Sequence, residues 1–187
     1  VIACGDDEEI RKIKSEKIVY YGFNDNNDVI CKNVVLTPNG SSFDVYIHNE
    51  FYGHFNLNLY GKHMLLDALA CIYMCYLEGI DVSEVQKNIN NFKGAKRRFS
   101  ETKINNNIIV DDYAHHPSEV KTVIETARQK YPTKQVVVVL IPYTISRTKA
   151  FYKEFAEVLK LADKAFVTDI EPARERFSDY PGITSDL

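Results

Sequence analysis

Residues 111–116 form the densest group of chemically active side chains in the sequence. They place two carboxylates, a phenol and two imidazoles within six residues, as Asp111-Asp112-Tyr113-Ala114-His115-His116. Carboxylates can accept hydrogen bonds from sugar hydroxyls or hold a cation, and imidazoles near a helix start can bind anions or move protons. Helix capping with surface exposure is the structural alternative, but a cap needs one such residue rather than five. We therefore interpret this segment as a candidate site.

Arg147 and Arg98 are candidate anion-binding residues outside that segment. Arg147 follows an apolar run, and a guanidinium at that place suits a carboxylate or a phosphate. A cation at a helix start opposes the helix dipole, so a bound anion accounts for it better than simple exposure does. Arg98 ends a segment with four cations in six residues, 93–98, which taken alone fits a solvated linker better than a phosphate clamp.

The elements that must position these residues alternate in type in the second half of the chain. Short apolar runs are separated by segments with helical spacing, and this β-α-β-α-β order predicts a parallel, doubly wound sheet. The run 136–141 is apolar throughout, as expected for a strand buried on both faces. Ligands bind at the carboxyl ends of strands in such sheets, where residues 111–116 and Arg147 fall. The predicted elements are strands at 108–110, 136–141 and 165–167 and helices starting at Pro117 and covering about 148–161.

The first half of the chain reads as β-rich and then helical. Phe43, Val45 and Ile47 alternate with other residues and therefore share one face of a strand. From about Lys62 to Glu78 the apolar spacing changes to that of a helix. His63 lies at the start of this helix and, taken alone, is an ordinary N-terminal histidine. The predicted strands are 18–23, 29–35, 42–48 and 55–59, with a turn at 50–54, and a second helix starts at Asp81.

Composition and charge exclude several classes of protein. A formal net charge of -3 gives no basic field for nucleic acid, and no run of about 18 apolar residues could insert into a membrane. The N-terminus lacks the residue order of a signal peptide. Four cysteines without paired spacing predict buried free thiols in a reducing cytoplasm, not disulfides or a zinc site. Eight glycines, none spaced as a phosphate loop, leave any nucleotide site incomplete.

Taken together, these motifs resemble the Mur ligase family. Residues 111–120 closely resemble that family's Asp-Asp-Tyr-(Ala/Gly)-His-His-Pro-x-Glu signature, in the form of members that add L-alanine to UDP-N-acetylmuramate. The segments Gly61-Lys62-His63, Gly94 to Phe99 and Ser146-Arg147-Thr148 are similar to further landmarks of the family in their order and spacing. The resemblance covers essentially the whole chain.

The resemblance implies an α/β fold class and two incomplete domains. Residues 1–103 would be the rear part of a central ATP-binding domain, β-rich and then helical. Residues 104–187 would be the first part of a Rossmann-like C-terminal domain with a parallel sheet. The UDP-sugar domain, the glycine-rich phosphate loop and the magnesium ligands would lie outside these residues. We therefore expect no metal ligands here and no activity of the chain by itself.

The resemblance also implies a reaction and a set of roles. ATP, with Mg²⁺, would phosphorylate the carboxylate of UDP-N-acetylmuramate, and the amine of L-alanine would attack the acyl phosphate in peptidoglycan precursor synthesis. Catalytic roles would fall to Tyr113, His115 and Arg147, which would face the acyl phosphate and the incoming amino acid. Nucleotide-binding roles would fall to His63, Asp67, Arg98 (at an ATP phosphate) and Asp112 (near the ATP ribose).

Three positions depart from the family pattern. Met64 and Asp67 stand where the family has asparagines that read adenine, and Tyr143 replaces a histidine. Met64 cannot hydrogen-bond adenine, and Asp67 can only accept.

A murein tripeptide recycling ligase is the nearest alternative function, but it tends to carry Phe in place of Tyr113. A non-catalytic remnant is the second alternative. A receiver-type signalling domain is excluded, because the run 136–141 is not followed by a phosphorylatable Asp.

Overall fold

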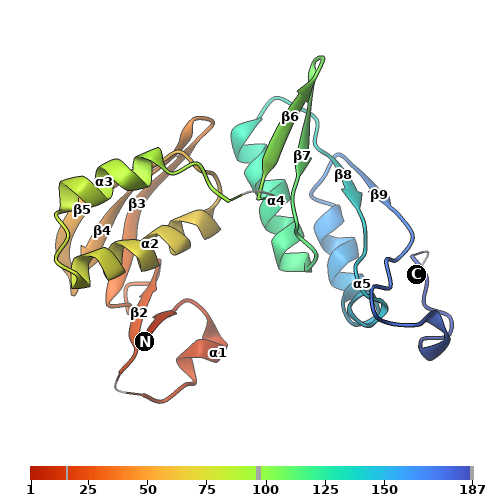
Figure 1. The fold of residues 1–187 in the computed structure, drawn as a ribbon, viewed down its shortest axis with the longest axis horizontal. Helices are drawn as coiled ribbons and strands as arrows, with labels where there is room; N and C mark the ends of the chain where they lie inside the picture. Colours follow the sequence, from red (N-terminus) through yellow and green to blue (C-terminus); the bar gives the residue numbers. More distant parts are fainter. Residues whose placement is uncertain (16, 96–97, 186–187) are drawn as a thin grey trace. The chain divides into compact units, whose positions relative to one another are not determined.

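The chain divides into two compact units, Val1–Gly94 and Ala95–Leu187 (Figure 1). The computed structural model describes residues 1–15, 17–95 and 98–185. The boundary between the units follows residue 94, whereas the resemblance implied a domain boundary after residue 103. Residues 100–103 belong with the second unit because the strand that begins at Ser100 pairs with another strand of that unit.

The first unit is built on a mixed five-stranded sheet. Its strands follow the order β1-β2-β3-β4-β5, so neighbours in the sequence are also neighbours in the sheet. The pairs β1–β2 and β2–β3 are parallel, whereas β3–β4 and β4–β5 are antiparallel hairpins. The bounds are β1 Ile2–Cys4, β2 Val19–Gly22, β3 Val29–Thr37, β4 Gly40–Ile47 and β5 Glu50–Leu57, with a short helix α1, Glu8–Arg11, between β1 and β2.

The predicted turn at 50–54 is wrong, because these residues belong to strand β5. The turn lies at His48 and Asn49, which both have positive φ, 49° and 68°. Ile47 pairs directly with Glu50, so the hairpin has a two-residue loop. Such loops need left-handed backbone at both positions to match the strand twist, and Asn is among the residues that tolerate it.

Two helices cover one face of this sheet, as Figure 1 shows for α2 (Lys62–Leu77) and α3 (Val82–Asn91). Both predicted helices are therefore confirmed, and Asp81 caps α3 by accepting from the backbone N–H of Ser83 at 2.8 Å. The alternation predicted for β4 is also confirmed, since Phe43, Val45 and Ile47 are buried. They form one core with apolar residues of α2 and with Val85 of α3.

The second unit contains a β-hairpin and a two-stranded parallel sheet. The hairpin pairs β6 (Ser100–Ile104) with β7 (Asn107–Asp111), and the parallel sheet pairs β8 (Val137–Leu140) with β9 (Lys164–Val167). Helix α4 (Pro117–Lys130) joins the two, α5 (Ile145–Leu159) connects β8 to β9, and a short 3-10 helix, η1 (Phe177–Asp179), follows. The α/β fold class with a parallel sheet is confirmed.

Two details of the predicted sheet differ from the structure. Among the described strands β7 pairs with β6 and is not joined to β8, so the strand 108–110 belongs to a hairpin that the sequence did not predict. Strand β8 is not buried on both faces, since the side chain of Val139 is 63% exposed. Helices α4 and α5 explain this, because both pack on the face of β8 that carries Val138 and Leu140.

The four cysteines are free thiols, as predicted, but they are not all buried. Cys31 is buried in strand β3, whereas Cys71 is exposed on α2 and Cys4 and Cys75 are half-buried. Burial raises the pKa of the Cys31 thiol to about 12, so this thiol is protonated at neutral pH. Within the described part of the chain, no helix has the length and apolar character to cross a membrane.

Candidate functional site

Asp112 holds the start of the loop between β7 and α4. One carboxylate oxygen accepts from the backbone N–H of Ala114 and the other from the backbone N–H of Phe99, both at 2.8 Å. The first bond closes a turn, and the second ties the loop to the segment that precedes β6. A carboxylate offers about four acceptor positions, so these two bonds leave room for a ligand hydroxyl. Asp112 therefore has a structural task whether or not it also binds a ligand.

His115 is fixed by its neighbours in a defined orientation. Its ring Nδ1 lies 2.7 Å from the carbonyl oxygen of Tyr113, and its backbone N–H donates to the Glu119 carboxylate at 2.9 Å. Because a carbonyl only accepts, Nδ1 carries the proton. In the neutral ring, Nε2 is then the nitrogen that can accept a proton from a ligand.

His116, the next residue, caps helix α4. Its Nδ1 accepts from the backbone N–H of Ser118 at 3.4 Å and lies 2.8 Å from the Ser118 hydroxyl, while Glu119 accepts from the backbone N–H of His116 at 3.1 Å. These contacts form a capping box at the helix start. The His116 ring also packs edge-to-face on Phe151 of α5 at 4.8 Å between centroids. This residue therefore has a structural role.

Glu119 is a carboxylate that the sequence reading did not single out. Burial raises the pKa of its carboxyl, but the backbone N–H groups of His115 and His116 and the positive charges of His115 and Arg98 lower it, and the net pKa lies below the ordinary value. A capping-box Glu three residues after His116 is the sequence signal that could have identified Glu119.

Tyr113 and Tyr143 lie near the His115 ring, and Arg147 contacts Tyr143. Tyr113 packs edge-to-face on His115 with centroids 4.9 Å apart, and Tyr143 lies 6.3 Å from His115. Arg147 donates to the carbonyl oxygen of Tyr143 at 3.4 Å. Tyr113 and His115 thus lie in the loop after β7, Tyr143 lies in the loop after β8, and Arg147 lies in the first turn of α5.

Helix α5 begins earlier than predicted, and this changes the place of Arg147. It starts at Ile145 rather than Thr148, so Arg147 is the third residue of its first turn. Glu175, from the segment after β9, accepts from the backbone N–H of Ser146 at 2.9 Å and from its hydroxyl at 2.5 Å. The sequence alone assigns Glu175 no role, because its partner Ser146 lies 29 residues away.

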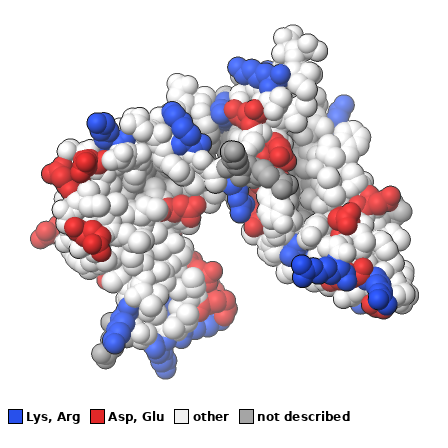
Figure 2. Space-filling view, in the orientation of Figure 1, with Lys and Arg blue, Asp and Glu red and all other residues white. Residues whose placement is uncertain are grey.

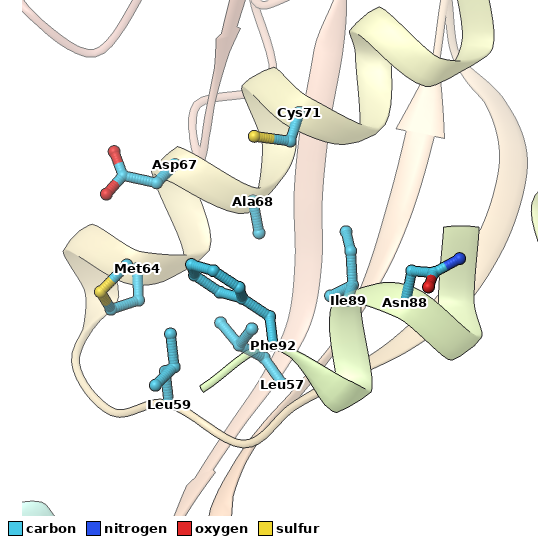
Figure 3. A pocket seen from close by; sticks show the side chains of 9 residues that line it. All are labelled: Leu57, Leu59, Met64, Asp67, Ala68, Cys71, Asn88, Ile89 and Phe92. Atoms are coloured by element: carbon cyan, nitrogen blue, oxygen red, sulfur yellow. The ribbon is translucent and has the colours of Figure 1, made fainter. Parts of the chain in front are cut away.

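In the first unit, Met64 and Asp67 of α2 line an apolar pocket of about 270 Å³ (Figure 3). The ring of Phe92 lies among the other side chains, and the polar ends of Asp67 and Asn88 point away from it at opposite edges. His63 is exposed on the first turn of α2. The full lining is Leu57, Leu59, Met64, Asp67, Ala68, Cys71, Asn88, Ile89 and Phe92.

On the face drawn in Figure 2, lysines and arginines are interspersed with aspartates and glutamates, consistent with a net charge of -3. In the described part of the chain, no group of three or more His, Cys, Asp or Glu side chains is placed to hold a metal ion. Arg98 is exposed, whereas Lys96 and Arg97 of the predicted cationic segment lie outside the described residues.

Comparison with known proteins finds similarity to Mur ligases. Residues 97–181 match the glutamate ligase domain of Mur ligases. The solved structure of UDP-N-acetylmuramate–alanine ligase from Thermotoga maritima aligns with 91% of this chain at a TM-score of 0.77 and 25% identity, over 38% of its own length.

Two further solved structures share the fold. A MurF ligase from Thermotoga maritima in complex with ADP aligns with 89% of this chain at a TM-score of 0.69 and 21% identity, over 39% of its length. A folylpolyglutamate synthase from Thermotoga maritima aligns with 86% at a TM-score of 0.58 and 16% identity, over 36% of its length. The chain therefore spans less than two-fifths of each of these three relatives.

Proposed function

We propose that this chain, which has the Mur ligase fold and carries the Mur ligase glutamate ligase domain, is part of an ATP-dependent ligase that joins L-alanine to UDP-N-acetylmuramate. The observation that carries the proposal is the group formed by His115, Tyr113, Tyr143 and Arg147. A fixed imidazole in one loop and a guanidinium at the start of α5 suit a reaction between an activated carboxylate and an amino acid. The Tyr113-Ala-His115-His116 signature supports L-alanine as the acceptor.

The residues of this group divide the chemistry between them. ATP, when bound, would supply the phosphoryl group that converts the sugar carboxylate into an acyl phosphate. Arg147 would bind a carboxylate or phosphate oxygen by charge-assisted hydrogen bonds. His115 would accept the proton that the attacking amine loses, because Nε2 is its free acceptor. Neutralisation and positioning of charge carry most of the rate enhancement in such phosphoryl transfers.

Each unit carries residues with a proposed role in nucleotide binding. In the second unit, Arg98 would contact a phosphate and the remaining acceptor positions of Asp112 would accept from the ribose hydroxyls. In the first unit, His63 and Asp67 lie at the start of α2, and the apolar pocket that includes Asp67 offers a surface for a flat base. Mg²⁺ would be held by residues other than these four.

The proposal is tested by expressing the whole open reading frame that contains these residues. We expect phosphate release from ATP that requires both UDP-N-acetylmuramate and L-alanine, and none from the 187-residue chain alone. The matched comparison replaces L-alanine by a murein tripeptide. A higher kcat/KM with the tripeptide would assign the protein to peptide recycling, and no dependence on either acceptor would make the chain a non-catalytic relative.

A further inference from the structure

We infer that Glu175 is a positioning residue, which fixes the first turn of α5 and thereby sets the direction in which Arg147 presents its guanidinium. The inference rests on the proposed function, in which Arg147 binds the anionic groups of the reactants. Glu175 itself does not touch the reacting atoms in this scheme. It acts on Arg147 through Ser146, the residue next to it in the chain.

The carboxylate of Glu175 accepts two hydrogen bonds from Ser146. One oxygen accepts from the backbone N–H and the other from the hydroxyl, at 2.9 and 2.5 Å. These bonds lower the pKa of the Glu175 carboxyl, with the hydroxyl bond as the main cause and the nearby charge of Arg147 as a smaller one. Glu175 is therefore ionised at neutral pH and serves as the side-chain cap that Thr144, at the N-cap position of α5, does not supply.

A second attachment holds the same two segments together a few residues away. The N–H of Thr144 donates to the carbonyl of Glu171 at 2.9 Å, and the N–H of Glu171 donates to the carbonyl of Pro142 at 2.8 Å. Thr144 and Ala173 both have positive φ, 69° and 54°, which costs conformational energy in residues other than glycine. Residues 171–175 thus bond both to the loop before α5, through Glu171, and to the first turn of α5, through Glu175. These hydrogen bonds hold Thr144 in its strained backbone conformation.

The position of Glu175 also decides where a substrate anion can bind. The N-terminus of a helix normally attracts anions, because its free N–H groups point outward. In α5 the N–H of Ser146 already donates to Glu175, so this N–H is not available to an anionic substrate. The guanidinium of Arg147, 3.4 Å from the carbonyl oxygen of Tyr143, is a cationic group of the same turn that can bind an anion.

The test compares Glu175→Ala with Glu175→Gln in the protein encoded by the whole open reading frame. Gln keeps an acceptor for the Ser146 N–H and can still pair with the hydroxyl, so it preserves the geometry while it removes the charge. We expect Glu175→Ala to raise the KM for the amino acid about tenfold, since misplacing a binding group by about 1 Å can cost up to about 10²-fold. Glu175→Gln should restore the KM to near the parent value. Glu154→Ala, an exposed acid on α5, is the matched control and should change nothing.

A measurement on the 187-residue chain checks the contact without any assay of activity. In an NMR titration, the amide signal of Ser146 should shift with the same midpoint as the Glu175 carboxyl carbon, and that midpoint should lie below the ordinary value for Glu. Glu175→Ala should abolish this shift. Independent midpoints would overturn the inference at its structural step.

Arg147→Ala separates failure of the inference from failure of the proposed function. If Arg147→Ala raises the KM for the amino acid and Glu175→Ala does not, Arg147 binds substrate and Glu175 does not position it. If Arg147→Ala leaves the KM unchanged, the function proposed for Arg147 is wrong. If Glu175→Ala and Glu175→Gln raise the KM equally, the charge of Glu175 matters rather than its geometry, and the positioning role is refuted.

Discussion

The ring Nδ1 of His115 lies 2.7 Å from the carbonyl oxygen of Tyr113, two residues earlier in the chain. In the next residue, His116, the same ring atom instead accepts from the N–H of Ser118. The two adjacent imidazoles therefore hold opposite tautomers when neutral, with the free acceptor on Nε2 of His115 only. This difference gives the two histidines of one motif separate tasks.

His116 should matter for stability and His115 for chemistry. His116→Ala removes a helix cap and should lower the free energy of unfolding of the second unit by about 1 kcal/mol, whereas His116→Asn, a good cap, should not. His115→Ala should leave stability nearly unchanged and lower kcat of the active protein by about 10²–10⁴-fold. Urea unfolding followed by NMR signals of the second unit measures the first effect. A loss of stability in His115→Ala as large as in His116→Ala would contradict this assignment.

Asp112→Ala should destabilise the second unit even in the absence of nucleotide. The substitution leaves the N–H groups of Phe99 and Ala114 without their acceptor, at an expected cost of about 1–3 kcal/mol. Thermal unfolding of the 187-residue chain measures the change, with Glu154→Ala as an exposed control. An unaltered melting temperature would mean that the loop does not depend on Asp112, and that a ligand is the main reason for a carboxylate there.

Arg147→Lys should impair the reaction more than the fold. An ammonium cannot bind a carboxylate through two parallel hydrogen bonds as a guanidinium can. In the protein encoded by the whole reading frame, the KM for alanine should rise and kcat should fall, with a loss on the order of 2–4 kcal/mol in transition-state binding. Steady-state kinetics and the melting temperature, measured on the same preparation, distinguish the two effects. Near-normal kcat/KM in Arg147→Lys would make this arginine a surface residue.

The pair formed by Asp44 and His54 should make the stability of the first unit depend on pH. Hydrogen bonds from Asn33 and then from His54, whose Nδ1 lies 2.6 Å from the carboxylate, hold the pKa of Asp44 below its ordinary value. A carboxyl whose pKa is lowered by folding stabilises the fold above its unfolded pKa of about 3.9. That stability is lost as the pH falls through the lower, folded pKa.

The measurement is the melting temperature of the first unit at several pH values on both sides of about 3.9. Asp44→Asn should flatten the acid limb of this profile, because the variant no longer gains protons on unfolding. Glu50→Gln, an exposed acid on the same strand as His54, is the control and should leave the limb as it is. An unchanged acid limb in Asp44→Asn would show that the pair contributes nothing.

Several features of this protein are determined by short stretches of sequence. The alternation of Phe43, Val45 and Ile47 determines the buried face of β4, and helical spacing determines α2, because both depend only on the geometry of one element. The motif at 111–116 likewise marks the loop that holds Tyr113 and His115. The hairpin turn was misplaced because Glu50 to His54 carry residues that occur in both turns and strands, and only the pairing of Ile47 with Glu50 fixes the turn at His48–Asn49.

Other features depend on contacts between distant residues, which no local pattern contains. The exposed face of β8 follows from the packing of α4 and α5 on one side, although its run of valines is equally apolar on both. The start of α5 and the presentation of Arg147 depend on Glu175, 29 residues from Ser146. The sequence thus determined which side chains could do chemistry. The tertiary structure decided which nitrogen of His115 can accept a proton and which carboxylate caps the first turn of α5, where Arg147 lies. Hydrogen-bond partners such as these are fixed only when the chain has folded.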